Sequence, residues 1–377
     1  MPNTEKQKVL VCPMDWGIGH ASRCVPLIQK LGELGFEVII AASGRPLEFI
    51  RKEYPGTQVI DFPGTPVTYP KNGWIALKML RALPRLLFGI WREHYALKTI
   101  ARQTGASLII SDNRYGCWHA TIPSVFMTHQ LDIQVPAGFL FLKGILKRIN
   151  YWFIRHYKEC WIPDFEAHRG LAGALSHPPK LPGNAFFIGI LSRFSIGKQR
   201  LHDYQSPGFD LLVMLSGPEP QRSILEEKIL MQLVNINMQV AMVRGIPESD
   251  EAYVLDDRIH VFSHLETAKM QELINQSALV ICRSGYSSIM DLVTLGKRAI
   301  FIPTPGQTEQ EYLARYLMDK KIYFSTTQKD FDLLYALEMS KNFPGMVIRN
   351  DYADLKSRIA AMAVKPPSAS SGQEQSA

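Results

Sequence analysis

The sequence is poor in features that mark several common classes of protein. Its 377 residues include only five cysteines and no C-x-x-C pair, which argues against a disulfide framework or a zinc site. We therefore expect buried free thiols in a reducing compartment. No apolar run reaches the ~20 residues of a membrane-spanning helix. The polar start of the chain leads directly into a strand pattern, unlike a signal peptide, so we expect a cytoplasmic protein.

Several motifs that bind nucleotides or metals are also missing. The chain has neither a P-loop lysine motif nor a G-x-G-x-x-G fingerprint. No Asp-x-Asp motif follows a predicted strand, so we expect no metal ion in the site. The formal net charge of +7 is modest for this length and is unevenly spread. A function must therefore be sought in less common patterns.

Strand patterns and helix patterns alternate along the chain, twice over. In the first half, apolar strands are predicted at residues 8–12, 36–42, 58–62, 107–111 and 124–127, with a helix at 21–34. In the second half, strands are predicted at residues 210–215, 239–243, 260–262, 279–282 and 299–302, with a helix at 221–235. Such alternation is typical of α/β proteins in which helices cover both faces of a parallel sheet. We expect two Rossmann-like, doubly wound domains.

A stretch rich in proline and glycine, residues 171–208, separates the two halves and indicates the connection between domains. A second composition change lies near the C-terminus, where serine, glutamine and proline predominate and disorder is expected. The predicted boundaries are an N-terminal domain at 1–190, a linker at 191–208, a C-terminal domain at 209–345, a helical segment at 346–365 and a disordered tail at 366–377.

The segment from Ala278 to Tyr312 is the most informative part of the chain. A buried type of strand ends in a short polar turn, and a helix begins directly after it. Free N–H groups and the helix dipole both point at such a turn, which makes it an anion site. Asp291, one to two turns into the helix, is placed to accept hydrogen bonds from a ribose diol. The pattern predicts a nucleoside diphosphate site, whose residues are Arg283, Ser284, Gly285, Tyr286, Ser287 and Ser288.

This segment resembles the nucleotide-sugar half of GT-B glycosyltransferases of family 28, which includes the bacterial N-acetylglucosaminyltransferase that completes lipid II. In that family a strand ends in Cys-Arg-Ser-Gly, a helix carries a ribose-binding acid, and a proline precedes a glutamine pair. Here the acid is Asp291 where the family usually has Glu, and the pair reads Gln310-Glu311. The resemblance implies two domains facing each other across a cleft, with a UDP-sugar bound on the C-terminal domain and the acceptor on the N-terminal domain.

The turn after the first strand, from Asp15 to His20, is the main motif of the N-terminal half. Gly17 and Gly19 allow a tight turn and a close approach of the backbone to a ligand. His20 lies at a helix N-terminus, where the dipole disfavours the imidazolium and keeps the ring available as a base. In related enzymes that transfer sugars to hydroxyls this histidine is the general base. The alternative is that His20 caps the helix or contacts a phosphate.

Asp112 follows the strand at 107–111. The carboxyl ends of parallel strands face the ligand crevice in doubly wound sheets, so Asp112 is predicted to orient His20. The alternative is an Asx turn that stabilises the loop. His129 and Gln130 follow the next strand and are predicted to line the acceptor side.

Further contacts are implied by position within the family pattern. Ser216 and Gly217 stand where the family has a Gly-Gly-Ser turn that approaches the diphosphate. Arg193 lies in the linker where the family carries a phosphate-contacting arginine; the alternative is a structural role. Arg244-Gly245 and residues 262–265 are expected to border the base.

Two stretches, residues 72–103 and 135–160, mix bulky apolar and aromatic side chains with lysine and arginine. This mixture is typical of helices in the headgroup layer of an anionic membrane. The alternative is a pair of core-packing helices with basic outer faces. A nucleic-acid partner is not expected, because the cations are interleaved with aliphatic residues and no nucleic-acid-binding motif is present.

These observations predict an inverting, metal-independent glycosyltransferase that uses a UDP-sugar and no other cofactor. We expect a lipid or lipid-linked acceptor and a peripheral position on the inner face of the cytoplasmic membrane. Two alternatives remain: a nucleotide-sugar hydrolase of the same fold, and a non-catalytic nucleotide-sugar-binding subunit.

Overall fold

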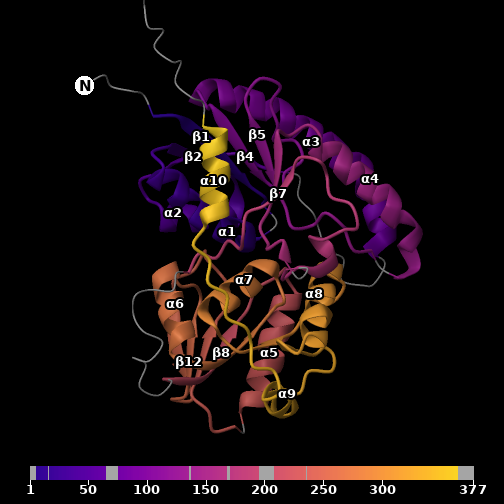
Figure 1. The fold of residues 1–377 in the computed structure, drawn as a ribbon. Helices are drawn as coiled ribbons and strands as arrows, with labels where there is room; N and C mark the ends of the chain where they lie inside the picture. The colour runs from indigo at the N-terminus through magenta and orange to yellow at the C-terminus, as the bar shows by residue number, and fades with distance from the viewer. Residues whose placement is uncertain are drawn as a thin grey trace, which may run out of the picture.

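The protein consists of two α/β domains stacked end to end (Figure 1). The computed structural model describes residues 6–15, 17–64, 75–135, 137–167, 170–194, 208–234 and 236–363, and it leaves out the side chains of residues 75–83 and of Ala137. Trp74, the side chain of Arg81, most of the predicted linker and the predicted disordered tail therefore lie outside the described residues.

The N-terminal domain is built on a parallel sheet in the order β3-β2-β1-β4-β5-β6-β7. Each predicted strand of this half is present to within about two residues at its ends. The last two strands lie where no strand was predicted, and β7 falls inside the stretch interpreted as the interdomain connection. That stretch is therefore part of the N-terminal domain up to β7. The strands are β1 Lys8–Pro13, β2 Glu37–Ala42, β3 Gln58–Asp61, β4 Leu108–Asp112, β5 Ser124–Met127, β6 Glu159–Ile162 and β7 Ala185–Phe187.

The C-terminal domain repeats the arrangement with the order β10-β11-β9-β8-β12-β13-β14. Every pair is parallel except β10 with β11, which is antiparallel and forms one edge. The α/β, doubly wound fold class predicted from the sequence is confirmed. The strands are β8 Phe209–Met214, β9 Val240–Val243, β10 Ala252–Leu255, β11 Ile259–Phe262, β12 Ser277–Cys282, β13 Ala299–Phe301 and β14 Phe324–Ser325.

Helices cover both sheets. In the N-terminal domain they are α1 Ile18–Glu33, α2 Gly44–Glu53, α3 Ile75–Thr104, α4 Lys143–Ile154 and the short 3-10 helices η1 Ala137–Leu142 and η3 Gly173–Leu175. In the C-terminal domain they are α5 Gln221–Leu233, α6 Thr267–Asn275, α7 Tyr286–Leu295, α8 Thr308–Asp319 and α9 Leu333–Ser340. Within the described residues no helix combines the length and the apolar character needed to cross a bilayer.

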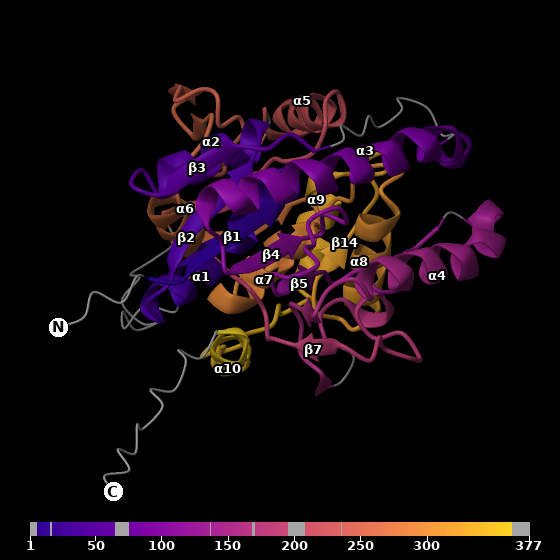
Figure 2. The ribbon, with the colours of Figure 1, turned by 90° about the horizontal axis from the view of Figure 1, so that it is seen from above.

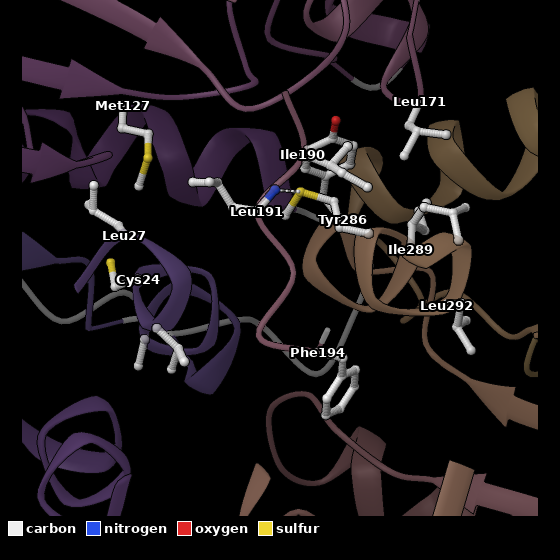
Figure 3. Packing of buried hydrophobic residues seen from close by; sticks show 14 of the residues in the cluster. Cys24, Leu27, Met127, Leu171, Ile190, Leu191, Phe194, Tyr286, Ile289 and Leu292 are labelled. Atoms are coloured by element: carbon white, nitrogen blue, oxygen red, sulfur yellow. Dashed lines mark hydrogen bonds between the residues drawn. The ribbon is translucent and has the colours of Figure 1, made fainter. Parts of the chain in front are cut away.

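The two domains share one continuous hydrophobic core. Cys24 and Leu27 of α1 belong to the same buried cluster as Tyr286 and Ile289 of α7. Figure 3 shows these side chains converging around the segment that carries Leu191. α7 is buried over most of its surface, and five of the seven residues from Ile289 to Leu295 are apolar. This packing fixes the N-terminus of α7 against the N-terminal domain.

The last helix, α10 Ala353–Met362, returns to the N-terminal domain (Figure 1), where it contacts β6 and β7. Arg358 pairs with Glu159 of β6, with Nε 3.1 Å from Oε2, and lies over the ring of Phe186 at 3.9 Å. The helical segment predicted at 346–365 is thus present, but it packs on the first domain. The chain crosses between the domains twice, and Tyr352 OH joins the two crossings by donating to Ser192 O at 2.9 Å.

Ion pairs close one side of the interface between the domains. Arg45 of α2 reaches Glu248 at 2.6 Å and Lys52 reaches Asp250 at 2.8 Å. Glu53, at the end of the same helix, accepts from the backbone N–H of Thr267 at 2.8 Å and thereby caps α6. The two domains are therefore in contact, and residues from both domains meet at their interface.

Candidate active site

His20, Asp112 and Arg23 form a buried cluster at the carboxyl ends of β1 and β4. His20 Nδ1 lies 3.0 Å from Asp112 Oδ2 and 2.8 Å from Arg23 Nη2. Arg23, on α1 one turn after His20, also binds Asp112 through Nε at 2.8 Å. With the proton on Nδ1, His20 donates to Asp112 and Nε2 is the basic nitrogen; with the proton on Nε2, Nδ1 accepts from Arg23 Nη2. A general base at Nε2 requires the first tautomer. The structure thus brings the two predicted residues together and adds Arg23.

The environment holds His20 neutral and Asp112 ionised. Burial lowers the pKa of His20 below its ordinary value, and Arg23 lowers it further, which outweighs the opposing effect of Asp112. Burial alone raises the pKa of Asp112, but Arg23 and His20 together hold it below its ordinary value. A neutral imidazole beside a carboxylate is the state that a general base requires.

The lowered pKa of His20 predicts a specific pH dependence. If the neutral ring is the base, activity is present above the pKa of His20 in the folded enzyme and is lost as the pH falls through it. Because that pKa lies below the ordinary 6.5, the acid limb of kcat/KM against pH is expected below pH 6.5. A limb centred at or above this value contradicts the assignment, and the residual rate of His20→Ala should lack the limb.

A second group of residues links this cluster to the C-terminal domain. Arg23 Nη1 lies 3.3 Å from His129 Nδ1, and His129 Nε2 lies 2.8 Å from Glu309 Oε1. Glu309 also accepts from Gln130, and the ring of His129 stacks on Tyr286 with centroids 4.2 Å apart. His129 and Gln130 were expected to line the acceptor side, whereas Glu309 was missed. In the sequence, the only indication that Glu309 belongs to the site is its position one residue before Gln310.

The N-terminus of α7 meets the His20 turn directly. Ser287 Oγ donates to Gly19 O at 2.7 Å. A Cβ atom at position 19 would lie 3.3 Å from Ser287 Oγ. This close approach explains the glycine. The N-cap of α7 is Gly285, which has no side chain to cap the helix, so the first N–H groups of α7 are free of intrahelical acceptors. The predicted anion site thus lies beside the predicted base.

Two residues of the predicted nucleotide site have side chains committed elsewhere. Arg283 is buried, and its guanidinium donates to Ile302 O at 3.0 Å and to Gln221 O at 2.8 Å. Burial lowers its pKa to about 10. Tyr286 is also buried, and its hydroxyl donates to Pro163 O at 2.9 Å. These side chains thus hold the loop and the domain interface, and a contact of either residue with a nucleotide stays a prediction.

The Gln310-Glu311 pair points back into its own loop. Gln310 Oε1 accepts from the N–H of Thr304 at 2.8 Å, and Glu311 Oε1 accepts from the N–H of Gly306 at 2.9 Å. Ser284 Oγ donates to the carbonyl of Gln310 at 2.8 Å, which ties this loop to the turn before α7. Both side chains thus form bonds that shape the loop, and their contact with a nucleotide-sugar stays a prediction; the neighbouring Glu309 faces the N-terminal domain.

Asp291 lies close to the linker residues. Its carboxylate accepts from Ser192 Oγ at 2.7 Å and lies 3.5 Å from Arg193 Nε. Burial raises the pKa of Asp291, against the effect of Arg193. Arg193 lies over the rings of Phe194 and Phe49 at 4.8 and 5.7 Å. A ribose contact by Asp291, which stays a prediction, requires a sugar hydroxyl to replace Ser192.

Gly217 lies in the loop that follows β8. It has φ +104, a conformation that favours glycine, and a side chain there would lie 3.3 Å from Thr304 Oγ1. The neighbouring Ser216 is exposed at the domain interface end of β8. Gly17 forms the N-cap of α1, and Ser288 is half-buried in the first turn of α7. Their contacts with a nucleotide stay predictions. Arg244, expected beside the base, instead binds Glu226 at 2.6 Å.

Comparison with known sequences identifies relatives of both halves of the chain. Residues 221–342 match the glycosyltransferase family 28 C-terminal domain. An "Uncharacterized glycosyltransferase" of Methanosarcina acetivorans is 23% identical over 326 residues, which cover 81% of each chain. The UDP-N-acetylglucosamine–N-acetylmuramyl-(pentapeptide) pyrophosphoryl-undecaprenol N-acetylglucosamine transferase of Caldanaerobacter subterraneus subsp. tengcongensis is 28% identical over 128 residues, which cover 31% of this chain and 34% of that protein.

Solved structures share the fold at low sequence identity. The spinosyn rhamnosyltransferase SpnG superposes with a TM-score of 0.61 at 15% identity, covering 94% of this chain and 97% of that one. MurG of Acinetobacter baumannii gives a TM-score of 0.51 at 12% identity, covering 95% and 94%. The chain is therefore a glycosyltransferase with the two-domain GT-B fold. Its C-terminal domain carries the family 28 match over residues 221–342, which agrees with the resemblance seen in the sequence.

Proposed function

We propose that the protein is an inverting, metal-independent glycosyltransferase that moves a sugar from a UDP-sugar to a hydroxyl of a membrane-associated acceptor. The observation that carries this proposal is the contact between Gly19 and Ser287, at 2.7 Å, which sets the His20–Asp112 pair beside the N-terminus of α7. A base for the acceptor hydroxyl and a positive end for the leaving diphosphate thus lie next to each other.

Each step of the reaction has a group in place. Nε2 of His20 takes the proton of the acceptor hydroxyl, and the oxygen attacks the anomeric carbon from the side opposite the diphosphate. The bond from the anomeric carbon to the diphosphate oxygen breaks, and its electrons leave with UDP. The helix dipole and free N–H groups of α7 stabilise the charge that develops on the diphosphate, and Arg193 adds a cation close to α7. One displacement of this kind inverts the anomeric centre.

A UDP-sugar donor is supported by the relatives. The enzyme from Caldanaerobacter is named as a transferase of N-acetylglucosamine from its UDP derivative. Most of the C-terminal domain falls within the family 28 match.

A membrane-associated acceptor is supported by an exposed face on the N-terminal domain, which we call the apolar-basic face. Figure 2 shows α3 and α4 extending on the same side of the domain. The face carries aromatic side chains exposed to 55% or more, with Arg85, Arg92 and Arg148 exposed among them. The alternative of core-packing helices holds for only part of each helix, since Leu97 and Ile154 are buried while these aromatic residues are exposed. The aromatic residues are Phe88 (61%), Trp91 (55%), Phe141 (72%) and Trp152 (56%).

Charge removal from this face tests the membrane contact. Replacing Arg85, Lys147 and Arg148 with Ser is expected to weaken binding to vesicles of anionic phospholipid by about 3 kcal/mol, or roughly a hundredfold. Co-sedimentation measures the effect. The control replaces three exposed cations of the C-terminal domain, Arg315, Lys320 and Lys341, with Ser and changes the net charge equally. Equal losses in both variants would show that net charge alone, and not this face, binds the vesicle.

The function is tested by UDP release from a panel of UDP-sugars, with and without a membrane lipid extract. The proposal predicts that one donor releases UDP rapidly only when lipid is present. Equal release without lipid identifies a hydrolase. Binding of UDP with no release from any donor identifies a non-catalytic nucleotide-sugar-binding subunit.

A further inference from the structure

A small cavity lies under α3, at the end of the N-terminal sheet that also carries the His20 cluster. Its volume is about 70 Å³, which holds at least about two water-sized groups. Hydrocarbon from Met14, Leu86, Ile90 and Tyr115 lines much of its wall. Leu86 belongs to the stretch of α3 that continues into the apolar-basic face, so the cavity and that face are neighbours.

One polar atom in this cavity has no partner among the described residues. Arg114 is buried, and its Nε binds Glu93 Oε1 at 2.6 Å while Nη1 donates to Phe62 O at 2.9 Å. Its Nη2 is buried and makes no hydrogen bond. A side chain at Gly64, which also lines the cavity, would lie 3.4 Å from Nη2. The missing side chain of Gly64 therefore leaves the space beside the free N–H donors open.

The charges around Arg114 determine which ligand suits this donor. Glu93 and Asp15 both lie beside the guanidinium, at 2.6 and 3.6 Å, so one cation faces two carboxylates. A bound phosphate would add a third negative charge in a place shielded from water, which is unfavourable. An ammonium group fits no better, because it has no acceptor for the Arg114 Nη2 donor and would lie beside a second cation.

We propose that this cavity is a binding site for a neutral oxygen, such as an ester carbonyl or a hydroxyl, at the head of an apolar chain, with Arg114 Nη2 as its hydrogen-bond donor. The inference rests on the proposed function, since it describes how a lipid acceptor is held with its reactive hydroxyl near His20. According to this inference, the part of the acceptor that contacts Arg114 Nη2 is uncharged. A phosphate there is excluded by the surrounding carboxylates.

The test is equilibrium binding of two matched probes to the full-length protein without a donor. Monooctanoylglycerol carries neutral oxygens and octyl phosphate carries an anion on a chain of equal length. Isothermal titration below the micelle concentration is expected to show monooctanoylglycerol binding at least about tenfold more tightly than octyl phosphate. Leu86→Trp fills the cavity and is expected to weaken the binding of monooctanoylglycerol about tenfold. Leu87 is the next residue and is exposed, so Leu87→Trp is the control. This variant should change the affinity for monooctanoylglycerol less than about twofold.

The outcomes separate this site from the proposed function. Equal or tighter binding of octyl phosphate overturns the site, as does unchanged binding by Leu86→Trp. Equal losses in the two tryptophan variants also overturn it, because they show that the chain binds to the outer face. If Leu86→Trp does not fold, Leu86→Phe takes its place. Failure of sugar transfer with the expected binding pattern instead overturns the function and leaves the site standing.

Discussion

His20→Ala is expected to lower kcat for sugar transfer by about 10²–10⁴-fold, the contribution typical of a general base. UDP affinity is expected to change less than about twofold, because the proposal places the nucleotide on backbone groups of the C-terminal domain. The physical reason is the geometry of the ring. Nδ1 of His20 lies 3.0 Å from Asp112, and burial, together with the neighbouring Arg23, lowers the pKa of the imidazole.

Steady-state kinetics with the donor identified by UDP release, and calorimetry with UDP, measure the two quantities. His260→Ala is a control, because His260 lies on β11 at the ring of Phe209; kcat should stay within about twofold of the wild type. Loss of UDP binding in His20→Ala would reassign this residue to a phosphate contact. Unchanged kcat would remove the base from the mechanism.

Asp112→Asn is expected to lower the free energy of unfolding by about 3–5 kcal/mol and also to impair transfer. Arg23 is only 2% exposed, and it binds Asp112 through two of its nitrogen atoms. Asparagine keeps the shape but removes the charge, so the buried guanidinium is left uncompensated. His20 loses the carboxylate that fixes its tautomer, and kcat falls for this second reason.

Chemical denaturation measures the stability, with Glu248→Gln as the matched control. Glu248 pairs with Arg45 at 2.6 Å, but both side chains are nearly half exposed, so that variant should lose less than about 1 kcal/mol. A similar loss in the two variants would contradict the buried pair. The pKa of Asp112 is held below its ordinary value of 3.8. The pair therefore contributes its stability above that pH and loses it as the pH falls through the folded pKa.

Much of the fold was predictable because many of its strands are apolar and buried. β1, β5 and β12 are buried along nearly their whole length and read as continuous apolar runs. β7 has three residues that are only half-buried, so the surrounding prolines and glycines concealed it. The return of α10 to the first domain depends on contacts distant in the sequence, such as Arg358 with Glu159, which periodicity does not reveal.

The site, like the fold, was predictable only in part. The positions of His20, Asp112 and the turn before α7 follow from strand ends and a helix N-terminus, which can be recognised in a sequence. The direction in which a side chain points cannot be recognised in this way. Arg283 and Gln310 stand in the expected positions, yet burial makes backbone groups their best partners. Glu309 faces the other domain because the phase of α8 turns it there, and only the packed structure shows that His129 lies opposite.

The most direct experiment is to incubate the protein with a radiolabelled UDP-sugar and a membrane lipid extract, and to determine where the label goes. A base beside a diphosphate site predicts label in the organic phase, in amounts equal to the UDP released, with the anomeric configuration inverted relative to the donor. Free labelled sugar in the aqueous phase, or a lipid product with the donor's configuration retained, would contradict transfer by a single displacement at His20.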